Sequence, residues 1–433
     1  MHPMVTTAQV PQPLRLLAAG TVAGMLGWLV ALAVSATALP AFASPASPAE
    51  KVGIRYLAQG KKVIPVSVRI GDWEITDIKL PDLVATNAQE PPVTVEQVEV
   101  VVKAAGAEAL RLTISGKPLA DAIVEFADIV NNQQRPLPAL QLAYGNIALP
   151  EGKVSDNGTL AGGQSLVLPL SKIAFVHLVG HTKVDELEIR LTVATGGERT
   201  VAAFPVALTP YQVTGRYMFP LKGDVQMAFL PLSYIHHRAA ASQEFAMDLV
   251  GANQKDAASF TDISRPNPMA LTDYGIWGRE VHAVGDGLVV ETGDRFPEKL
   301  MSDPVKFNQP DYVRGVLKEL IPQIGWTNAV AGNYVVIDHF NGEFSVYCHL
   351  QEGSIRVRTG DKARKGMVIA RVGNTGNSSA PHLHFQLMDG QSFFTANGLP
   401  MMFGNVPARA MIVDYPVTAN TLSFSDSIFY TVP

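Results

Sequence analysis

Two histidines separated by one residue are the part of this sequence best suited to chemistry. His382 and His384 follow a glycine-punctuated segment and lie within Pro-His-Leu-His-Phe385. Residues two apart on a β-strand point to the same face, so both imidazoles would project into one site, with Leu383 in a core behind them. Imidazole nitrogen is a preferred zinc ligand. The pair therefore predicts part of a metal site, whose remaining ligands must come from elsewhere in the chain.

A carboxylate inside an apolar strand is a candidate for one of these ligands. Asp248 lies in the alternating run Phe245–Val250, where its neighbours are apolar. A charge in such a strand is unfavourable unless it is paired or binds a metal. The alternative is an Asp at the end of a strand that accepts hydrogen bonds from a turn, and the sequence alone leaves both interpretations open.

The other histidines and the cysteine have structural interpretations. His177 and His181 share a predicted strand and loop, and His282 and His339 lie in or at the end of predicted strands. The sequence has one cysteine, Cys348, which excludes both an intramolecular disulfide and a cysteine-based zinc cluster. The sequence also lacks a His-Glu-x-x-His helix, which excludes a thermolysin-like arrangement.

One predicted strand, Phe344–Leu350, brings a further histidine into consideration. The alternation of a strand places His349 on the same face as Tyr347 and opposite to Cys348. A Cys–His nucleophilic pair is therefore not expected, and Tyr347 is a candidate substrate contact.

Composition limits the class of protein. The chain has 433 residues, enough for two or three domains, and 47% of them are hydrophobic against 17% charged. This balance argues against disorder and favours a membrane or exported context. The net charge of −5 provides no basic field for nucleic acid, so no nucleic-acid partner is expected.

The first 43 residues have the layout of a secretory signal. Arg15 is their only charged residue, an uncharged run follows from Leu16 to Leu39, and Ala41-Phe-Ala43 resembles a cleavage site. An uncleaved anchor is the alternative, because about 20 apolar residues span a bilayer. In either case the rest of the chain is expected to be exported, to the periplasm or as a secreted protein, with membrane contact only through this segment. Its oligomeric state stays open.

The rest of the chain is predicted to be mainly β. Residues 44–231 contain short alternating runs separated by turn signals such as Ser115–Pro118 and Thr195–Glu198, which predicts a β-sandwich region of one or two immunoglobulin-like units, with a short helix at Ala120–Val130. Residues 232–405, with glycine at nearly every corner, predict an antiparallel β domain, and residues 406–433 a C-terminal β extension. Within this domain, the insert Phe296–Thr327, helical over Asp311–Leu320, is expected to form a wall of the cleft.

Three motifs together resemble a known family. Tyr347-x-His-Leu350, Gly373-Asn-Thr-Gly376 and Pro381-His-Leu-His-Phe385 stand in the order and spacing of the lysostaphin-type, or LytM-like, zinc metalloendopeptidases, which cleave peptidoglycan cross-links. The resemblance covers residues from about 234 to 405. It implies Zn²⁺ as the cofactor and the peptide of peptidoglycan as the substrate. A catalytically silent relative that binds or regulates cell-wall enzymes is the alternative function.

The resemblance also implies a role for each site residue. The zinc ligands would be His237, Asp248 and His384, and the unliganded active-site histidines would be His349 and His382. In the best-known members the first His and the Asp are four residues apart, whereas here they are eleven apart, so His236 remains an alternative to His237. The implied chemistry is hydrolysis in which zinc activates water while the two unliganded histidines move a proton and stabilise the oxyanion.

Overall fold

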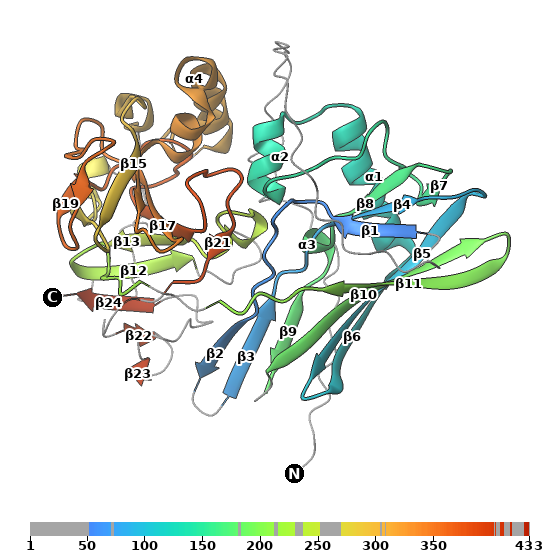
Figure 1. Ribbon diagram of the computed structural model, residues 1–433. Helices are drawn as coiled ribbons and strands as arrows, with labels where there is room; N and C mark the ends of the chain where they lie inside the picture. The colour runs from blue at the N-terminus through green and yellow to red at the C-terminus, as the bar shows by residue number, and fades with distance from the viewer. Residues whose placement is uncertain are drawn as a thin grey trace.

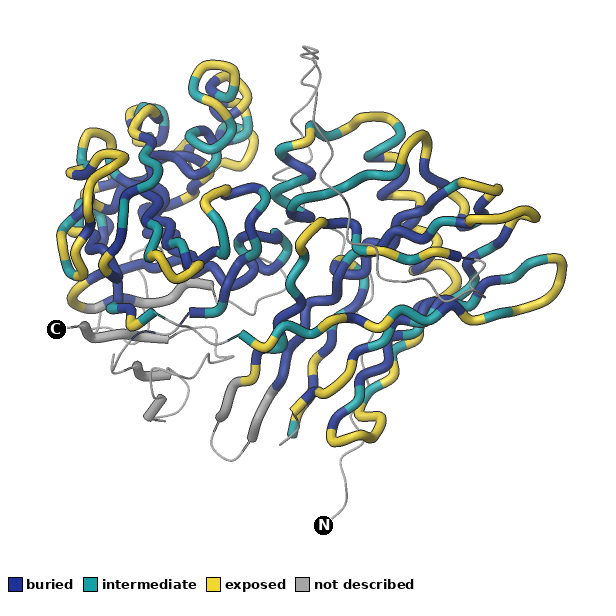
Figure 2. The backbone as a smooth tube through the Cα atoms, in the orientation of Figure 1, coloured by how far each residue is buried: buried dark blue, intermediate teal, exposed yellow. Residues whose placement is uncertain are grey.

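The computed structural model describes most of the chain between residues 52 and 432. The described ranges are 52–70, 73–180, 183–211, 215–229, 237–251, 270–303, 305–307, 309–401, 403, 408–410, 416–417 and 428–432. The predicted signal, His181 and His236 lie outside them. Figure 1 shows the described residues as two β-rich halves lying side by side, and Figure 2 shows buried strands at their centres with exposed residues gathered at the turns.

The N-terminal half consists of antiparallel sheets around a shared core. The largest has the order β11-β10-β5-β6, with β7 beside β5, and these strands span Glu198–Val206, Val184–Thr195, Val93–Ala104, Ala107–Ser115 and Thr159–Leu160. A second is β1-β4-β8 (Val52–Tyr56, Leu83–Asn87, Ser165–Leu168), and a third is β2-β3-β9 (Val66–Ile70, Trp73–Ile78, Val176–Val179). One apolar cluster includes residues of all three. The predicted β character of this half is confirmed, and the immunoglobulin-like interpretation stays a prediction.

Turn chemistry sets the register of the long hairpins in this half. Gly196 and Gly197 have φ of 57° and 89° and join β10 to β11, so that Thr195 pairs with Glu198. Two-residue turns with positive φ match the twist of the strands they connect. The turn predicted at Thr195–Glu198 is confirmed. The turn predicted at Ser115–Pro118 is wrong, because β6 ends at Ser115 and helix α1 begins at Gly116. Proline in the first turn of a helix forfeits no helical hydrogen bond.

Helices cover part of both halves. They are α1 (Gly116–Asn131), α2 (Leu137–Tyr144) and α3 (Leu170–Ile173) in the N-terminal half, and α4 (Pro310–Ala331) in the C-terminal half. The predicted helices Ala120–Val130 and Asp311–Leu320 are therefore parts of α1 and α4. Helix α4 has a non-helical residue at Gly325, with φ of 81° and ψ of 166°. Within the described ranges, no helix has the length and apolar character needed to cross a membrane.

The C-terminal half is organised on one long antiparallel sheet. Its order is β18-β15-β16-β17-β20-β13-β12-β24-β22-β23, and the strands span Lys362–Ala363, Gly287–Gly293, Asn333–Asp338, Phe344–Leu350, Leu383–Met388, Met247–Gly251, Gly223–Phe229, Ile428–Val432, Ala408–Ala410 and Pro416–Val417. Strand β21 (Gly398–Leu399) pairs with β20, and β14 (Glu280–His282) pairs separately with β19 (Val368–Arg371). Strand β12 precedes residue 232 and β24 follows residue 405, so this sheet extends beyond the predicted range 232–405 on both sides.

The two halves pack against each other. Ile64 and Val66 of the N-terminal half belong to the apolar cluster beneath the C-terminal sheet. The 237–244 segment, which carries a predicted ligand, receives a hydrogen bond from Lys79 Nζ to the Ala240 carbonyl at 3.1 Å. Its Ala241 amide donates to the Leu142 carbonyl at 3.1 Å. Residues far apart in the sequence therefore fix the position of this segment.

Candidate metal centre

Three neighbouring strands bring polar side chains together on one face of the C-terminal sheet. Asp248 on β13 lies directly opposite His384 on β20, and His384 lies opposite Cys348 on β17. Residues directly opposite across antiparallel strands project to the same face. The alternating positions Leu249, Leu383 and Tyr347 are fully buried in the core on the other face. Backbone pairing alone therefore brings a carboxylate and an imidazole together.

His237 approaches this pair from outside the sheet. It begins the 3-10 helix His237–Ala239, and its Nε2 lies 2.9 Å from Asp248 Oδ1. Its Nδ1 lies 3.2 Å from Gln243 Oε1, and its ring centroid lies 4.5 Å from that of His384. If Nδ1 donates to the glutamine oxygen, Nε2 presents its lone pair toward Asp248.

His384 is oriented by a glutamine on its own strand. Its Nε2 lies 2.8 Å from Gln386 Oε1, and Gln386 Nε2 donates to the Ser242 carbonyl at 3.1 Å. This second bond orients the amide, so His384 Nε2 must carry the hydrogen. His384 Nδ1 then presents a lone pair to Asp248 Oδ1 at 3.1 Å. Two acceptors at this distance repel one another unless a proton or a cation lies between them.

The donor atoms fit a metal ion. His237, Asp248 and His384 each offer one atom, these atoms lie within 4.8 Å of one another, and all three residues are buried. Zinc binds histidine nitrogen and carboxylate oxygen at about 2.0–2.2 Å, which three atoms this close can satisfy together. Glutamines on the outer nitrogens of both imidazoles are the kind of supporting partner that orients metal-binding histidines. This group could hold a metal ion.

Two further histidines border the group. His382 Nε2 lies 3.4 Å from Asp248 Oδ1, and its Nδ1 lies 2.7 Å from the Ala380 carbonyl. His349 Nδ1 lies 2.7 Å from the Thr375 carbonyl, and the ring centroids of His349 and His382 are 4.6 Å apart. A carbonyl can only accept, so each Nδ1 carries the hydrogen. Each Nε2 is then available to take up a proton.

The prediction that His349 shares a face with Tyr347 is wrong. His349 has a φ of 59°, in the left-handed region that residues other than glycine rarely adopt, and this interrupts the alternation of β17. Its ring therefore reaches the face of Cys348. Tyr347 is fully buried in the core, and its hydroxyl accepts a hydrogen bond from the Val284 amide at 2.8 Å, so Tyr347 is not a substrate contact.

Cys348 lies on the same face as the histidines and is 1% exposed. Burial raises the pKa of its thiol, and the charge of Asp248 raises it further. The thiol is therefore protonated at neutral pH and is not a nucleophile. The sequence analysis expected no Cys–His pair because the two side chains would lie on opposite faces. They lie on the same face, and the pair is excluded because the thiol stays protonated.

Electrostatics within the group are dominated by burial and by the Asp248 carboxylate. Burial alone would raise the pKa of Asp248, but the charges and hydrogen bonds of His237 and His382 hold it well below its usual range. Burial, followed by the charges of His382 and His384, lowers the pKa of His349 well below its usual value. Burial acts to lower the pKa of His382, but Asp248 outweighs it and raises that pKa.

The loop before β20 is built to hold His349 and His382. Asn374 and Thr375 are fully buried, and Thr375 Oγ1 donates to the Leu350 carbonyl at 2.8 Å. Gly376 has a φ of 82°, and a Cβ there would collide with the backbone of Gly332. Asn374 and Thr375 therefore shape the loop, and glycine at 376 permits its close approach to the end of α4.

Three other histidines of the described ranges lie outside the group, and the side chains of two of them have local partners. His339 bonds to the Asp286 carbonyl and to Ser345 Oγ, at 2.8 and 2.9 Å. His177 pairs with Asp77 at 3.0 Å in the N-terminal half. The amide of His282 donates to the Pro220 carbonyl at 2.8 Å.

The sequence analysis did not find Gln243 or Gln386, the two glutamines that orient the histidine ligands. Gln386 lies two residues after His384 on the same strand, so strand alternation could have indicated that it shares the face of His384.

Comparison with known proteins finds relatives of one stretch of the C-terminal half. Residues 305–395 match the sequence model of Peptidase family M23. The chain is 47% identical over 84 residues to the peptidoglycan DD-endopeptidase ShyA of Vibrio cholerae, covering 19% of this chain and 17% of that protein. It is 38% identical over 77 residues to the glycyl-glycine endopeptidase ALE-1 of Staphylococcus capitis, covering 18% and 21%. The resemblance to the lysostaphin-type peptidases is confirmed.

The lysostaphin-like stretch is only part of the molecule. The chain spans about a fifth of the length of these curated relatives. The crystallised catalytic domain of lysostaphin from Staphylococcus simulans is 27% identical, covering 28% of this chain and 68% of that one, with a TM-score of 0.19. His349, His382 and His384 lie inside the range matched by the M23 model, whereas His237 and Asp248 precede it.

Proposed function

We propose that the protein is an exported, zinc-dependent endopeptidase that hydrolyses the peptide cross-links of bacterial peptidoglycan. The observation that carries this proposal is the convergence of His237, Asp248 and His384 on one point, with His349 and His382 beside it. The similarity to endopeptidases named for peptidoglycan and glycyl-glycine bonds supports the substrate class.

His237 Nε2, Asp248 Oδ1 and His384 Nδ1 would hold the ion. Three protein ligands leave a fourth position open to water or substrate, which is characteristic of catalytic zinc. When bound, the ion polarises a carbonyl oxygen and makes water more acidic. Gln243 and Gln386 keep the ligand nitrogens of His237 and His384 unprotonated, and Asp248 supplies the negative charge that a divalent cation requires.

His349 and His382 would handle the proton. The depressed pKa of His349 keeps its Nε2 unprotonated at neutral pH, so that this atom can accept a proton from the attacking water. His382 presents its Nε2 toward the same centre, and in its protonated form this Nε2–H can donate a hydrogen bond to the developing oxyanion or protonate the leaving amine. The Ala380 and Thr375 carbonyls fix both rings, so these roles need no rearrangement.

Metal content tests this proposal together with hydrolysis. We expect elemental mass spectrometry to find about one zinc ion per chain in the wild-type protein and far less in His384→Ala. The His384→Ala variant should also lose hydrolysis of purified peptidoglycan. His177→Ala is the matched control, because it removes a histidine from the N-terminal half and should retain both.

The outcomes separate the two functions considered. Zinc binding without hydrolysis of any cross-link would favour the catalytically silent relative that binds or regulates cell-wall enzymes. A wild-type protein that takes up no zinc on reconstitution would contradict the peptidase proposal altogether.

A further inference from the structure

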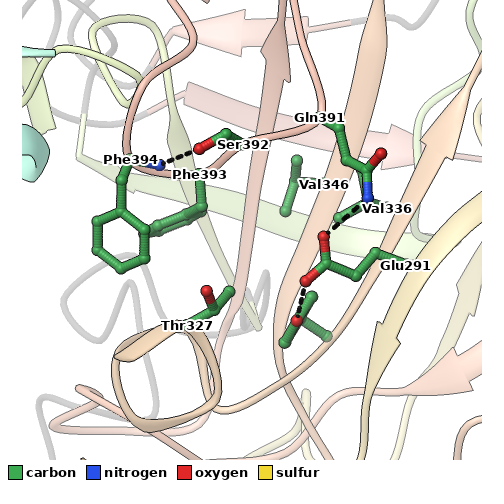
Figure 3. A pocket seen from close by; sticks show the side chains of 9 residues that line it. Glu291, Thr327, Val336, Val346, Gln391, Ser392, Phe393 and Phe394 are labelled. Atoms are coloured by element: carbon green, nitrogen blue, oxygen red, sulfur yellow. Dashed lines mark hydrogen bonds between the residues drawn. The ribbon is translucent and has the colours of Figure 1, made fainter. Parts of the chain in front are cut away.

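A pocket lies beside the candidate metal centre on the same face of the sheet. Its volume is about 350 Å³, within the lower part of the range of about 300–1,000 Å³ typical of small-molecule sites. Val336 and Val346 form its floor, and Phe393 forms one side (Figure 3). The ring of Phe393 also lies 6.5 Å from that of His384, so this side chain borders both the pocket and the metal centre.

The register of the sheet relates the pocket to the metal centre. Gln386, Val346, Val336 and Glu291 lie opposite one another across β20, β17, β16 and β15. His384 and Cys348 occupy the neighbouring row on the same face, two residues before Gln386 on β20 and two residues after Val346 on β17. Two residues along a strand span roughly 7 Å. Glu291 lies three strands, roughly 14 Å, across the sheet from β20. A peptide that crosses the metal ligands can therefore place in the pocket a side chain within a few residues of the bond over the metal.

One negative charge lies in the pocket without a counter-charge in its lining. Glu291 accepts a hydrogen bond from the Tyr334 hydroxyl. It accepts another, at 3.1 Å, from Gln391 Nε2, which a dashed line in Figure 3 marks. Both donors are neutral, and the other lining residues are Thr, Ser, Val and Phe. Within the described ranges, no Lys, Arg or His forms an ion pair with Glu291. A carboxylate has about four acceptor sites, so Glu291 can accept further hydrogen bonds.

We propose that this pocket binds a substrate side chain made of an aliphatic stem with a terminal ammonium group. Val336, Val346 and Phe393 would cover the stem, and Glu291 would accept charge-assisted hydrogen bonds from the ammonium. Tyr334 and Gln391 hold the carboxylate in place. This inference rests on the proposed function, because it assigns the pocket to a peptide bound at the metal centre, and it identifies an amine-bearing residue near the scissile bond as a determinant of specificity.

The alternative is that Glu291, Tyr334 and Gln391 serve only to fasten the segment after β20 to the sheet. This structural role predicts that a change of Glu291 lowers the stability of the protein, but that the affinity for a ligand does not depend on the ligand's charge. The experiment therefore compares a ligand whose side-chain amine is free and charged with one whose amine is acetylated and neutral.

Binding of two matched probes tests the proposal without requiring turnover. The probes are soluble stem peptides from peptidoglycan that carry a free side-chain amine, and the same peptides after acetylation of that amine. We expect the full-length, metal-loaded protein to bind the free-amine probe roughly 10- to 100-fold more tightly by calorimetry. In Glu291→Gln, which preserves size and an acceptor oxygen, the two affinities should become equal.

Controls keep the outcomes distinct. Glu319→Gln removes the same charge from an exposed position on α4 and should retain the wild-type preference. Thermal unfolding and zinc content should show that Glu291→Gln is folded and metal-loaded. Equal binding of both probes by the wild-type protein, or a preference that survives in Glu291→Gln, would overturn the proposal. A Glu291-dependent preference without hydrolysis of any cross-link would support the pocket and contradict the proposed peptidase activity.

Discussion

The predicted metal ligands are positioned in two different ways. Asp248 and His384 lie opposite one another on paired strands, so the backbone ladder of the sheet places both. His237 lies on a short 3-10 helix in the 237–244 segment. The N-terminal half contributes several of the contacts that hold this segment, including Lys172 Nζ to the Ala239 carbonyl at 2.5 Å. One part of the metal centre is therefore local to its sheet, and the other depends on a distant part of the chain.

A buried ion pair makes this dependence testable. Lys61 Nζ lies 3.2 Å from Glu244 Oε2, with the two side chains 9% and 4% exposed. Burial alone would raise the pKa of Glu244, but Lys61, Lys79 and Arg238 bring it below its usual value. The pair joins residues 183 positions apart in the sequence. It fastens the 237–244 segment to the N-terminal half.

The largest expected effect follows from breaking this pair. Lys61→Met keeps the aliphatic stem but leaves a buried carboxylate with less compensation, so the free energy of unfolding should fall by roughly 2–4 kcal/mol. Zinc affinity should weaken as well, because His237 loses its support. Urea unfolding and competition with a chromogenic chelator measure the two quantities.

The neighbouring residue provides a matched control for Lys61→Met. Lys62 pairs with Asp389 at 2.8 Å, but its side chain is 39% exposed, and exposed pairs contribute at most about 1 kcal/mol. Lys62→Met should therefore have little effect on either quantity. If zinc affinity falls equally in both variants, the N-terminal half does not position His237.

The contrast between ligands placed by the sheet and a ligand held by distant contacts explains how far the sequence could predict the site. The shared face of His382 and His384 follows from strand alternation, because residues two apart on a strand point the same way. The place of Asp248 opposite His384 depends on the pairing of β13 with β20, which no local pattern predicts. The orientation of His349 could not be read from alternation, because its positive φ depends on the loop packed above it. The supports of His237 could not be predicted either, because they join positions that no local pattern connects.

The fold shows the same limit. Alternating runs within residues 44–231 predicted strands such as β5, and the glycine turn at Thr195–Glu198 predicted the β10–β11 hairpin, because both signals are local. The short strands β1, β4 and β8, and the packing of Ile64 and Val66 into the C-terminal core, depend on partners elsewhere in the chain. Composition and periodicity carry no information about such partners.

A second prediction compares the glutamines that orient the two histidine ligands. Gln386 is fully buried, whereas Gln243 is partly exposed. Loss of such supporting partners typically lowers metal affinity by about 10- to 100-fold. Gln386→Met should approach the upper value, because no water can replace the lost hydrogen bond, and Gln243→Met should lie near the lower one. Chelator competition measures the zinc affinity of both variants. A larger loss of affinity in Gln243→Met than in Gln386→Met would show that the orientation of His384 on the sheet depends less on its glutamine than that of His237 does.

The smallest expected effect concerns a buried acid beneath the loop that positions His349 and His382. Burial raises the pKa of Glu298 to about 7, while its Oε1 accepts a hydrogen bond from the Asn374 amide at 3.0 Å. The protonated form is favoured in the folded state, so its contribution to stability is fully present below the unfolded pKa of about 4.3 and is lost as pH rises through about 7.

Glu298→Gln removes this titration while retaining an oxygen for the Asn374 amide. The variant should be more stable than the wild type at pH 8 by about 1–3 kcal/mol, and the difference should shrink toward zero near pH 4. Urea unfolding across this pH range measures it. Zinc affinity at pH 8 should stay unchanged, because Glu298 supports the loop and contacts none of the three predicted ligands. A constant difference in stability at every pH would show instead that the effect comes from packing and not from the proton.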